Sequence, residues 1–129
     1  MLSRVREPDS AMRTLIERVC LIPSTLRESG NRSVIDLVRD AGAAERAEAL
    51  TSARLERFLI DNRPVIEEWL SYSENKRTSS GWYFREVEGV YLVGRYPEDA
   101  VIRFSDPVAA CAAFILREIA SIRDQAQRI

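Results

Sequence analysis

Histidine is absent from this chain of 129 residues, and cysteine occurs only twice. The missing imidazole removes the commonest general base, the usual activating partner of a serine or cysteine nucleophile, and the commonest metal ligand. Cys20 and Cys111 lie far apart in the sequence, so a structural zinc site would have too few ligands. The sequence also lacks a glycine-rich phosphate loop and a dinucleotide fingerprint. We therefore expect no metal and no cofactor.

Long apolar runs and a basic excess are missing as well. No apolar run approaches the roughly 18 residues of a membrane span, and the opening MLSRVREPDSAMR carries charges where a signal peptide needs apolar residues. We expect a cytoplasmic protein that does not bind membranes. With 19 basic and 20 acidic residues, the net charge of −1 also lacks the excess that holds nucleic acid through its phosphates. Direct binding of nucleic acid is therefore not expected.

What is present fits one folded domain. A hydrophobic fraction of 46% with 30% charged residues is typical of a globular protein and excludes a mainly disordered chain. Both cysteines fall within apolar helical patterns, so we expect them to be reduced core residues. We expect residues 1–129 to form a single domain, with a mainly helical part over 1–76, a β-meander over 82–104 and a C-terminal helix over 106–127.

The apolar spacing of the N-terminal half predicts a cluster of helices. One runs from Asp9 with apolar residues on a single face until Pro23 ends it, and a short turn around residues 24–29 follows. Three later residues are suited to begin helices, two as hydroxyl N-caps and one as a proline in the first turn: Ser33, Thr51 and Pro64.

After Gly81 the pattern changes to that of a sheet. WYFREV and VYLVGRY are rich in aromatic and β-branched residues, and Glu88-Gly89 between them is a tight-turn signal, which predicts a hairpin. A second turn over 97–99 and a third strand over 100–104 complete an antiparallel meander. Strand alternation would place Trp82 and Phe84 in the core and Tyr83 on the other face.

The C-terminal segment predicts a long amphipathic helix that packs on this sheet. Asp106 can cap it, and Pro107 suits its first turn. Its apolar stripe is unbroken: Val108, Cys111, Ala112, Ile115, Leu116, Ile119 and Ile122. Helices, then strands, then a helix predict an α+β fold, with an N-terminal helical cluster followed by a three-stranded antiparallel β-meander packed against a long C-terminal helix.

Few polar motifs suggest catalysis. Ser73 and Lys76 match the S-x-x-K spacing of serine acyltransferases, but the companion motifs are missing, and a solvated helix end explains the same residues. Glu67 and Glu68 are adjacent on a predicted helix and point in different directions, so they do not form a shared-proton pair. We therefore assign no catalytic residue.

Acidic residues gather around the predicted hairpin and the turn that follows it, where they outweigh Arg95 and Arg103. This bias suggests an acidic docking face for a basic partner, although protection of edge strands and solubility explain the same charges. The candidate partner-binding residues are Tyr83, Glu86, Glu88, Tyr91, Glu98 and Asp99.

Two stretches, SENKRTSSGWYF and FSDPVAACAAFILREI, give roughly the C-terminal half of the chain a resemblance to a known family. They resemble the small cytoplasmic immunity proteins that protect bacteria from polymorphic toxins and from toxins of contact-dependent growth inhibition. The resemblance implies a protein without catalysis that binds one toxin domain, often a nuclease, and blocks its active site or its access to substrate. It also implies that residues 77–81 mainly form the joint between helix and sheet.

The expected function is therefore that of an immunity protein whose partner is a cognate toxin domain, and which is a monomer or weak dimer in isolation. Two alternatives stay open. A non-catalytic regulatory or adaptor module, in monomeric or dimeric form, would bind another protein through an exposed helix. A small hydrolase or transferase with carboxylate chemistry would require two acids that meet in one pocket.

Overall fold

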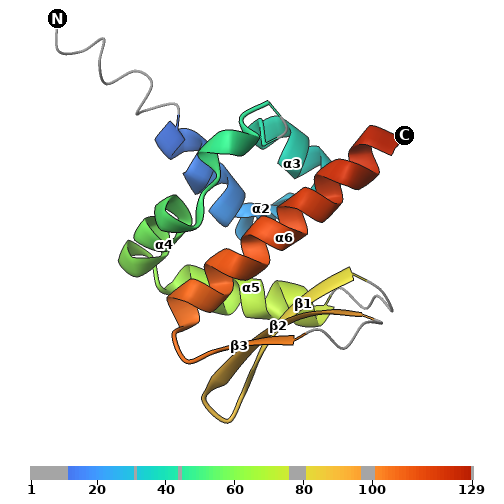
Figure 1. Ribbon diagram of the computed structural model, residues 1–129. Helices are drawn as coiled ribbons and strands as arrows, with labels where there is room; N and C mark the ends of the chain where they lie inside the picture. Colours follow the sequence, from blue (N-terminus) through green and yellow to red (C-terminus); the bar gives the residue numbers. More distant parts are fainter. Residues whose placement is uncertain (1–11, 31, 44, 76–80, 97–100, 129) are drawn as a thin grey trace, which may run out of the picture.

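The computed structural model describes residues 12–30, 32–43, 45–75, 81–96 and 101–128, and it confirms the predicted α+β fold class (Figure 1). Helices come first, then an antiparallel sheet in the order β1-β2-β3, then a long helix. A helix over residues 12–20 is followed by α2 (Ile22–Ser29), α3 (Val34–Ala41), a 3₁₀ turn (Ala47–Ala49), α4 (Ser52–Asp61), α5 (Pro64–Asn75), β1 (Gly81–Val87), β2 (Val90–Tyr96), β3 (Val101–Phe104) and α6 (Pro107–Arg128).

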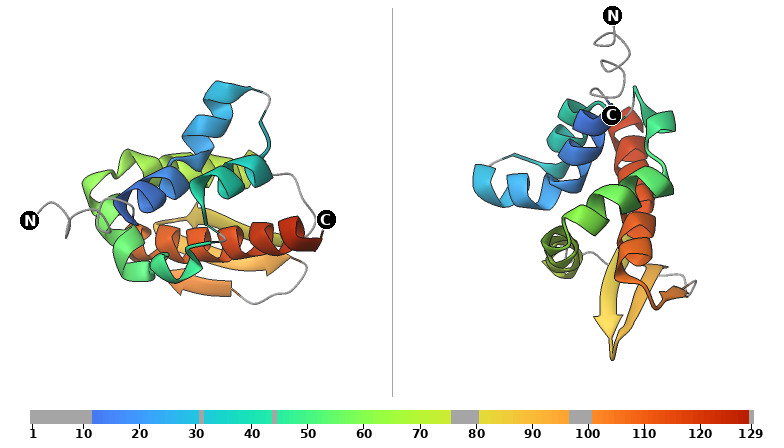
Figure 2. Two further views of the ribbon diagram at one scale, coloured as in Figure 1. Left: turned by 90° about the horizontal axis from the view of Figure 1, so that it is seen from above. Right: turned by 90° about the vertical axis from the view of Figure 1, so that its left-hand side faces the viewer.

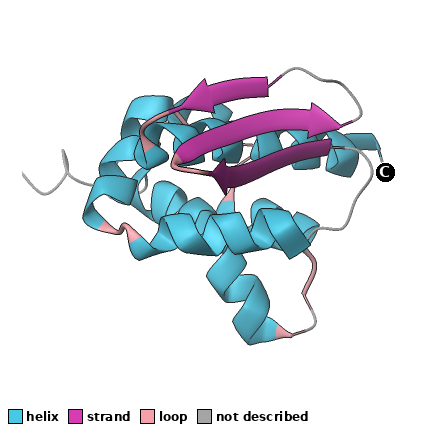
Figure 3. Cartoon of the chain, turned by 90° about the horizontal axis from the view of Figure 1, so that it is seen from below, coloured by secondary structure: helices cyan, strands magenta, loops and turns pink. Residues whose placement is uncertain are grey.

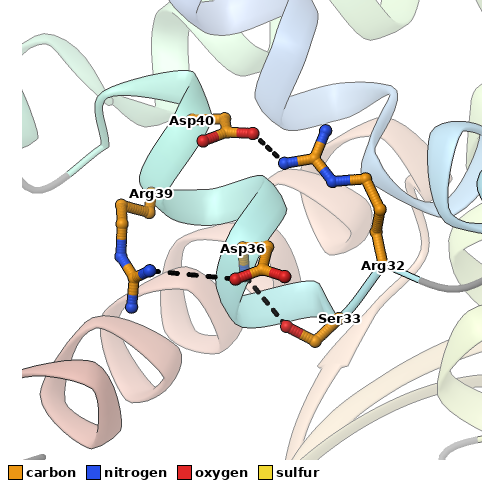
Figure 4. Close-up of polar contacts among 5 residues, drawn as sticks. All are labelled: Arg32, Ser33, Asp36, Arg39 and Asp40. Carbon is orange, nitrogen blue, oxygen red and sulfur yellow. Dashed lines mark hydrogen bonds and ion pairs between the residues drawn. The ribbon is translucent and has the colours of Figure 1, made fainter.

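Three of these helices begin at N-caps that the sequence predicts. At the start of α3 the Oγ of Ser33 accepts the backbone N–H of Asp36 at 3.1 Å, which satisfies one of the unpaired donors of the first turn (Figure 4). The other two caps work in the same way: Thr51 Oγ1 accepts the Arg54 N–H at 3.3 Å, and Asp106 Oδ1 accepts the Val108 N–H at 3.0 Å.

The turn predicted around residues 24–29 is wrong, because this segment is the helix α2. Pro23 does not end the helical structure there. It lies in the first turn of α2, where a backbone N–H has no acceptor within the helix, so the missing N–H of proline costs no hydrogen bond. Helical backbone hydrogen bonding continues from the helix over 12–20 into α2, since the N–H of Thr25 donates to the carbonyl of Leu21 at 2.9 Å. The side chain of Ile22 is 1% exposed, so burial holds α2 against the core.

The β1–β2 hairpin has the predicted turn. Glu88 and Gly89 both adopt positive φ, at 51° and 82°, as a two-residue type I′ turn requires. The register pairs Phe84 with Val93 and then Ile102, which places these three side chains on the face toward the helices. The turn predicted over 97–99 and the first residue of the predicted third strand, Ala100, lie outside the described residues.

Helix α6 lies between the sheet and the helical cluster formed by α3, α4 and the helix over 12–20 (Figures 1 and 2). Its Phe114 stacks on Phe84 of β1, with ring centroids 5.6 Å apart. The predicted apolar stripe faces the core as expected, with Leu116 half-buried and these members buried: Val108, Cys111, Ala112, Ile115, Ile119 and Ile122. Burial of both sides of one helix joins the helical and β parts into one core.

Helix α5 begins at Pro64, as predicted, and its C-terminal half runs beside β1 (Figure 3). The Oγ of Ser73 accepts the backbone N–H of Phe84 at 2.7 Å. An edge strand exposes unpaired backbone groups, so this bond closes part of the free edge of β1. Gly81 opens the strand with a φ of 104°, which agrees with the expectation that a glycine relieves strain at the joint. Residues 76–80 of the joint lie outside the described chain.

Two polar contacts are built into the core beside α5. Trp69 is fully buried, and its Nε1–H donates to the carbonyl of Cys20 at 2.8 Å. The hydroxyl of Tyr72 donates to Glu118 Oε2 at 2.6 Å, and the Glu118 residue is only 4% exposed. Burial, together with the charge and the hydrogen bond of Glu118, raises the pKa of Tyr72 above its ordinary value. These contacts hold α5 against the helix over 12–20 and against α6.

Both cysteines are free thiols, as predicted, and both are buried. Burial raises the pKa of the Cys20 thiol to about 12. The pKa of Cys111 is also raised, first by burial and then by the neighbouring Cys20. The two thiols therefore stay protonated near neutral pH and act as core residues.

Candidate functional site

A groove of about 520 Å³ runs between α5 and β1. Its walls come from the exposed side of α5 and from both faces of the edge strand β1, with Tyr96 from the end of β2. The bond from the Phe84 N–H to Ser73 holds the two walls together. The groove therefore lies at the junction of helix and sheet that SENKRTSSGWYF spans, of which residues 73–75 and 81–84 are described.

The groove is acidic. Among its described lining residues, Glu67 and Glu74 extend from α5 and Glu86 from β1, and Arg85 is the only basic one. The pKa of Tyr91 is raised by partial burial and then by the negative charges of Glu86 and Glu67. Carboxylates from two different elements, α5 and β1, thus act on one hydroxyl.

The adjacent acids of α5 point in different directions, as the sequence predicts. Glu67 lines the groove, whereas Glu68 Oε2 pairs with Arg27 Nη2 of α2 at 3.3 Å. Helical geometry separates neighbouring side chains by about 100°, so only one of the two can face β1.

The predicted partner-binding residues divide among three places. Glu86 and Tyr91 are cross-strand partners on the face toward the helices, and Glu88 lies at the hairpin tip. Tyr83 lies on the opposite face but at the edge, where it also lines the groove. Glu98 and Asp99 fall outside the described residues. The structure therefore brings Tyr83, Glu86 and Tyr91 to or beside one groove and leaves Glu88 apart from it.

The S-x-x-K spacing does not form a described pair, because Lys76 lies outside the described residues. Ser73, the other member, points at the edge of β1 and holds the Phe84 N–H. This structural bond uses one lone pair of its hydroxyl. No local pattern around Ser73 indicates this role, since the role depends on a strand residue 11 positions further along the chain.

The outer face of the sheet, away from α6, has a different charge from the one expected for the sheet as a whole. Strand alternation places Arg85 and Arg103 on it, on either side of Leu92. Around them lie Tyr83, Val87, Val90, Gly94, Tyr96 and Val101. No acidic residue occurs among the described strand residues of this face. The acids of the hairpin instead face the groove or project from the turn.

Three acids important to this structure were missed at the sequence level. Glu67 and Glu74 reach the groove only because α5 lies against β1, which no local pattern specifies. The signal for Glu118 was present, since it stands four residues after Phe114 and seven after Cys111, within the apolar stripe. A charged residue at such a position has to find a buried partner, here Tyr72.

Within the described ranges, no group of three or more potential ligands is placed to hold a metal ion, and no helix combines the length and apolarity needed to cross a membrane. Comparison of the chain with protein-family models, with curated proteins and with solved structures finds no match. The groove and the sheet are therefore the features of the molecule that bear on its function.

Proposed function

We propose that this protein neutralises a cognate toxin domain by binding it, with the acidic groove between α5 and β1 as the contact surface. The observation that carries the proposal is the convergence of Glu67, Glu74 and Glu86 in one groove, where Arg85 is the only basic residue among the described lining residues. A nuclease contacts phosphates through lysine and arginine, so its substrate-binding surface is basic. An acidic groove offers that surface complementary charge and competes with its substrate.

The groove also offers anchors for tight binding. Tyr83 and Tyr96 pack together at one end, with ring centroids 4.6 Å apart, and Trp82 lines the wall. Aromatic side chains in the centre of an interface often carry most of its binding energy, while surrounding charges set the association rate. A groove with acids and aromatic rings fits a partner that inserts a basic side chain or a short basic segment.

Co-expression tests the function directly. We expect the neighbouring upstream gene to encode a large secreted protein with a variable C-terminal domain, and this chain to rescue growth of cells that express that domain. The purified pair should form a stable complex. Growth arrest that co-expression does not relieve, with no complex between the purified proteins, would refute toxin neutralisation.

A charge-matched pair of variants tests the groove. In E67Q/E86Q the groove loses two carboxylates, whereas E45Q/E48Q removes the same charge from exposed residues around the 3₁₀ turn. We expect the groove variant to associate with the toxin domain about tenfold more slowly at low salt, with a smaller difference at high salt, because steering is screened. Equal rates for the two variants would place the interface elsewhere, without affecting the rescue result.

The same cluster supports a second candidate, an enzyme that uses carboxylates. Glu67, Glu74 and Glu86 bring more than one acid into a single groove, which is the first requirement of that alternative. Its test is turnover of ester, glycoside and phosphoester substrates by the purified protein. Activity that E86Q abolishes while the fold is retained would favour the enzyme, and inactivity of the wild type on all three classes would favour binding.

A further inference from the structure

The outer face of the sheet is an open surface that no described helix covers (Figure 3). Three of its apolar side chains are unusually accessible, since Val87, Tyr96 and Val101 are 46%, 39% and 39% exposed. The opposite face of the same sheet is covered by α6. One-sided coverage leaves these apolar side chains accessible to a partner.

The outer face carries two arginines, one on each side of Leu92. The register aligns Arg85, Leu92 and Arg103 in one row across the three strands. Neither arginine forms an ion pair with another residue that the structure describes. The two guanidinium groups therefore belong to strands on either side of β2, whose Val90 and Leu92 lie between them on this face.

The dimensions of this arrangement fit a helix. Neighbouring strands lie about 4.8 Å apart, so Arg85 and Arg103 are separated by about 10 Å across β2. An α-helix with its side chains is about 10–12 Å wide. A helix lying along β2 would cover Leu92 and bring both of its flanks within reach of an arginine.

We propose that the outer face of the sheet binds an amphipathic helix of a partner protein, with an apolar stripe over Val90 and Leu92 and acidic side chains along both flanks, paired with Arg85 and Arg103. This inference goes beyond toxin neutralisation, because Val90, Leu92 and Arg103 do not line the acidic groove, whereas Arg85 lies at the border of both surfaces. The helix would cover the sheet from the side opposite α6 and complete a three-layer arrangement.

A second copy of the chain is disfavoured as the occupant. The outer faces of two copies would bring arginines together with no acid among their described strand residues to pair with them. Such like-charge contacts oppose association.

Single-stranded nucleic acid is also disfavoured, because the aromatic ring best placed for stacking is already engaged. Tyr83 lies over Gly94, where an added Cβ would be 2.5 Å from Cζ of the ring. Its ring also contacts Tyr96, with centroids 4.6 Å apart, and the Arg85 guanidinium carbon stands 4.8 Å from its centroid.

Two synthetic helical peptides test the proposal. Both carry a leucine stripe at i, i+3, i+4 and i+7 on an alanine background, one with glutamate and the other with lysine on the two flanks. We expect the glutamate peptide to bind the full chain at least tenfold more tightly, with nuclear magnetic resonance shifts centred on Leu92 and Arg103. In R103E the preference should weaken or reverse, whereas R46E, the same change at an exposed residue far from the sheet, should preserve it.

Four results of the binding experiments would overturn the inference. These are no binding of the glutamate peptide at about 1 mM, equal binding of the two peptides, the same peptide preference in R103E and R46E, and tighter binding of a single-stranded oligothymidylate to the outer face. A dimer detected by light scattering, with Leu92 in its interface, would also overturn the inference. A failed toxin rescue leaves all of these results unchanged, so the two proposals fail separately.

Discussion

The hydroxyl of Ser73 accepts the backbone N–H of Phe84 across 2.7 Å, and this bond ties the end of α5 to the edge of the sheet. Phe84 is 1% exposed, so its N–H has little access to water if the bond is lost. One hydroxyl thus positions both walls of the acidic groove.

Replacement of Ser73 by alanine should destabilise the fold by about 1–3 kcal/mol, the cost of leaving a buried donor without an acceptor. S71A is the matched control, since Ser71 is exposed on the same helix. Urea unfolding of both variants measures the difference. Equal stability of S73A and S71A would show that the edge of β1 is satisfied in another way.

Alkaline pH should weaken the fold through Cys20. Burial raises the pKa of its thiol from 9.0 to about 12, so the folded state holds a proton that the unfolded chain releases. The contribution is complete below about pH 9 and disappears as the pH rises toward 12, up to about 4 kcal/mol in total. Burial raises the pKa values of Cys111 and Tyr72 as well, so their contributions fall in the same direction.

Urea unfolding between pH 8 and 11 measures this loss. C20A should start less stable, because a core atom is removed, but its stability should decline less steeply with pH. The same slope in wild type and C20A would contradict the assignment to Cys20. Both thiols of the folded wild type should also resist a thiol reagent at pH 8 and react only after unfolding.

Removing the charge of Glu86 should lower the pKa of Tyr91, because that carboxylate is one of the causes that raise it. E86Q and E88Q form a matched pair, since Glu88 lies at the hairpin tip and is not among those causes. Titration of Tyr91 by nuclear magnetic resonance gives the measurement. A pKa that shifts equally in both variants would argue against a local contact between Glu86 and Tyr91.

Glu88 should be replaceable with a gain in stability. Its φ of 51° lies in the left-handed region, which costs an ordinary residue about 1–2 kcal/mol. Asparagine accepts this conformation and is favoured before glycine in type I′ turns, so E88N should stabilise the hairpin by up to about 1 kcal/mol. E88Q separates charge from conformation and should leave stability unchanged. A gain in E88Q equal to that in E88N would assign the effect to charge.

Much of the fold could be predicted from local sequence, because its signals act over a few residues. Ser33, Thr51 and Asp106 cap helices wherever those helices lie, and Gly89 favours a tight turn because glycine adopts positive φ readily. Pro23 shows the limit of such signals. A proline can end one helix or begin the next. Here Pro23 lies in the first turn of α2, whose Ile22 is buried, and a local pattern does not reveal that burial.

The candidate site was only partly predictable. Tyr83, Glu86 and Tyr91 were identified from the charge and aromatic content of the hairpin, and they lie in or beside the groove. Glu67 and Glu74 were not, because a pattern along one helix does not state which strand it will meet.

The α+β class, the starts of α3, α4, α5 and α6, and the alternation that separates Phe84 from Tyr83 could be predicted from the amino-acid sequence, since all of these follow from local spacing and backbone preference. Three further features depend on the folded chain as a whole: α5 lies against the edge of β1, Ser73 closes that edge, and Arg85 and Arg103 flank Leu92. Such contacts join residues that are distant in sequence, and their geometry is fixed by how the whole core packs.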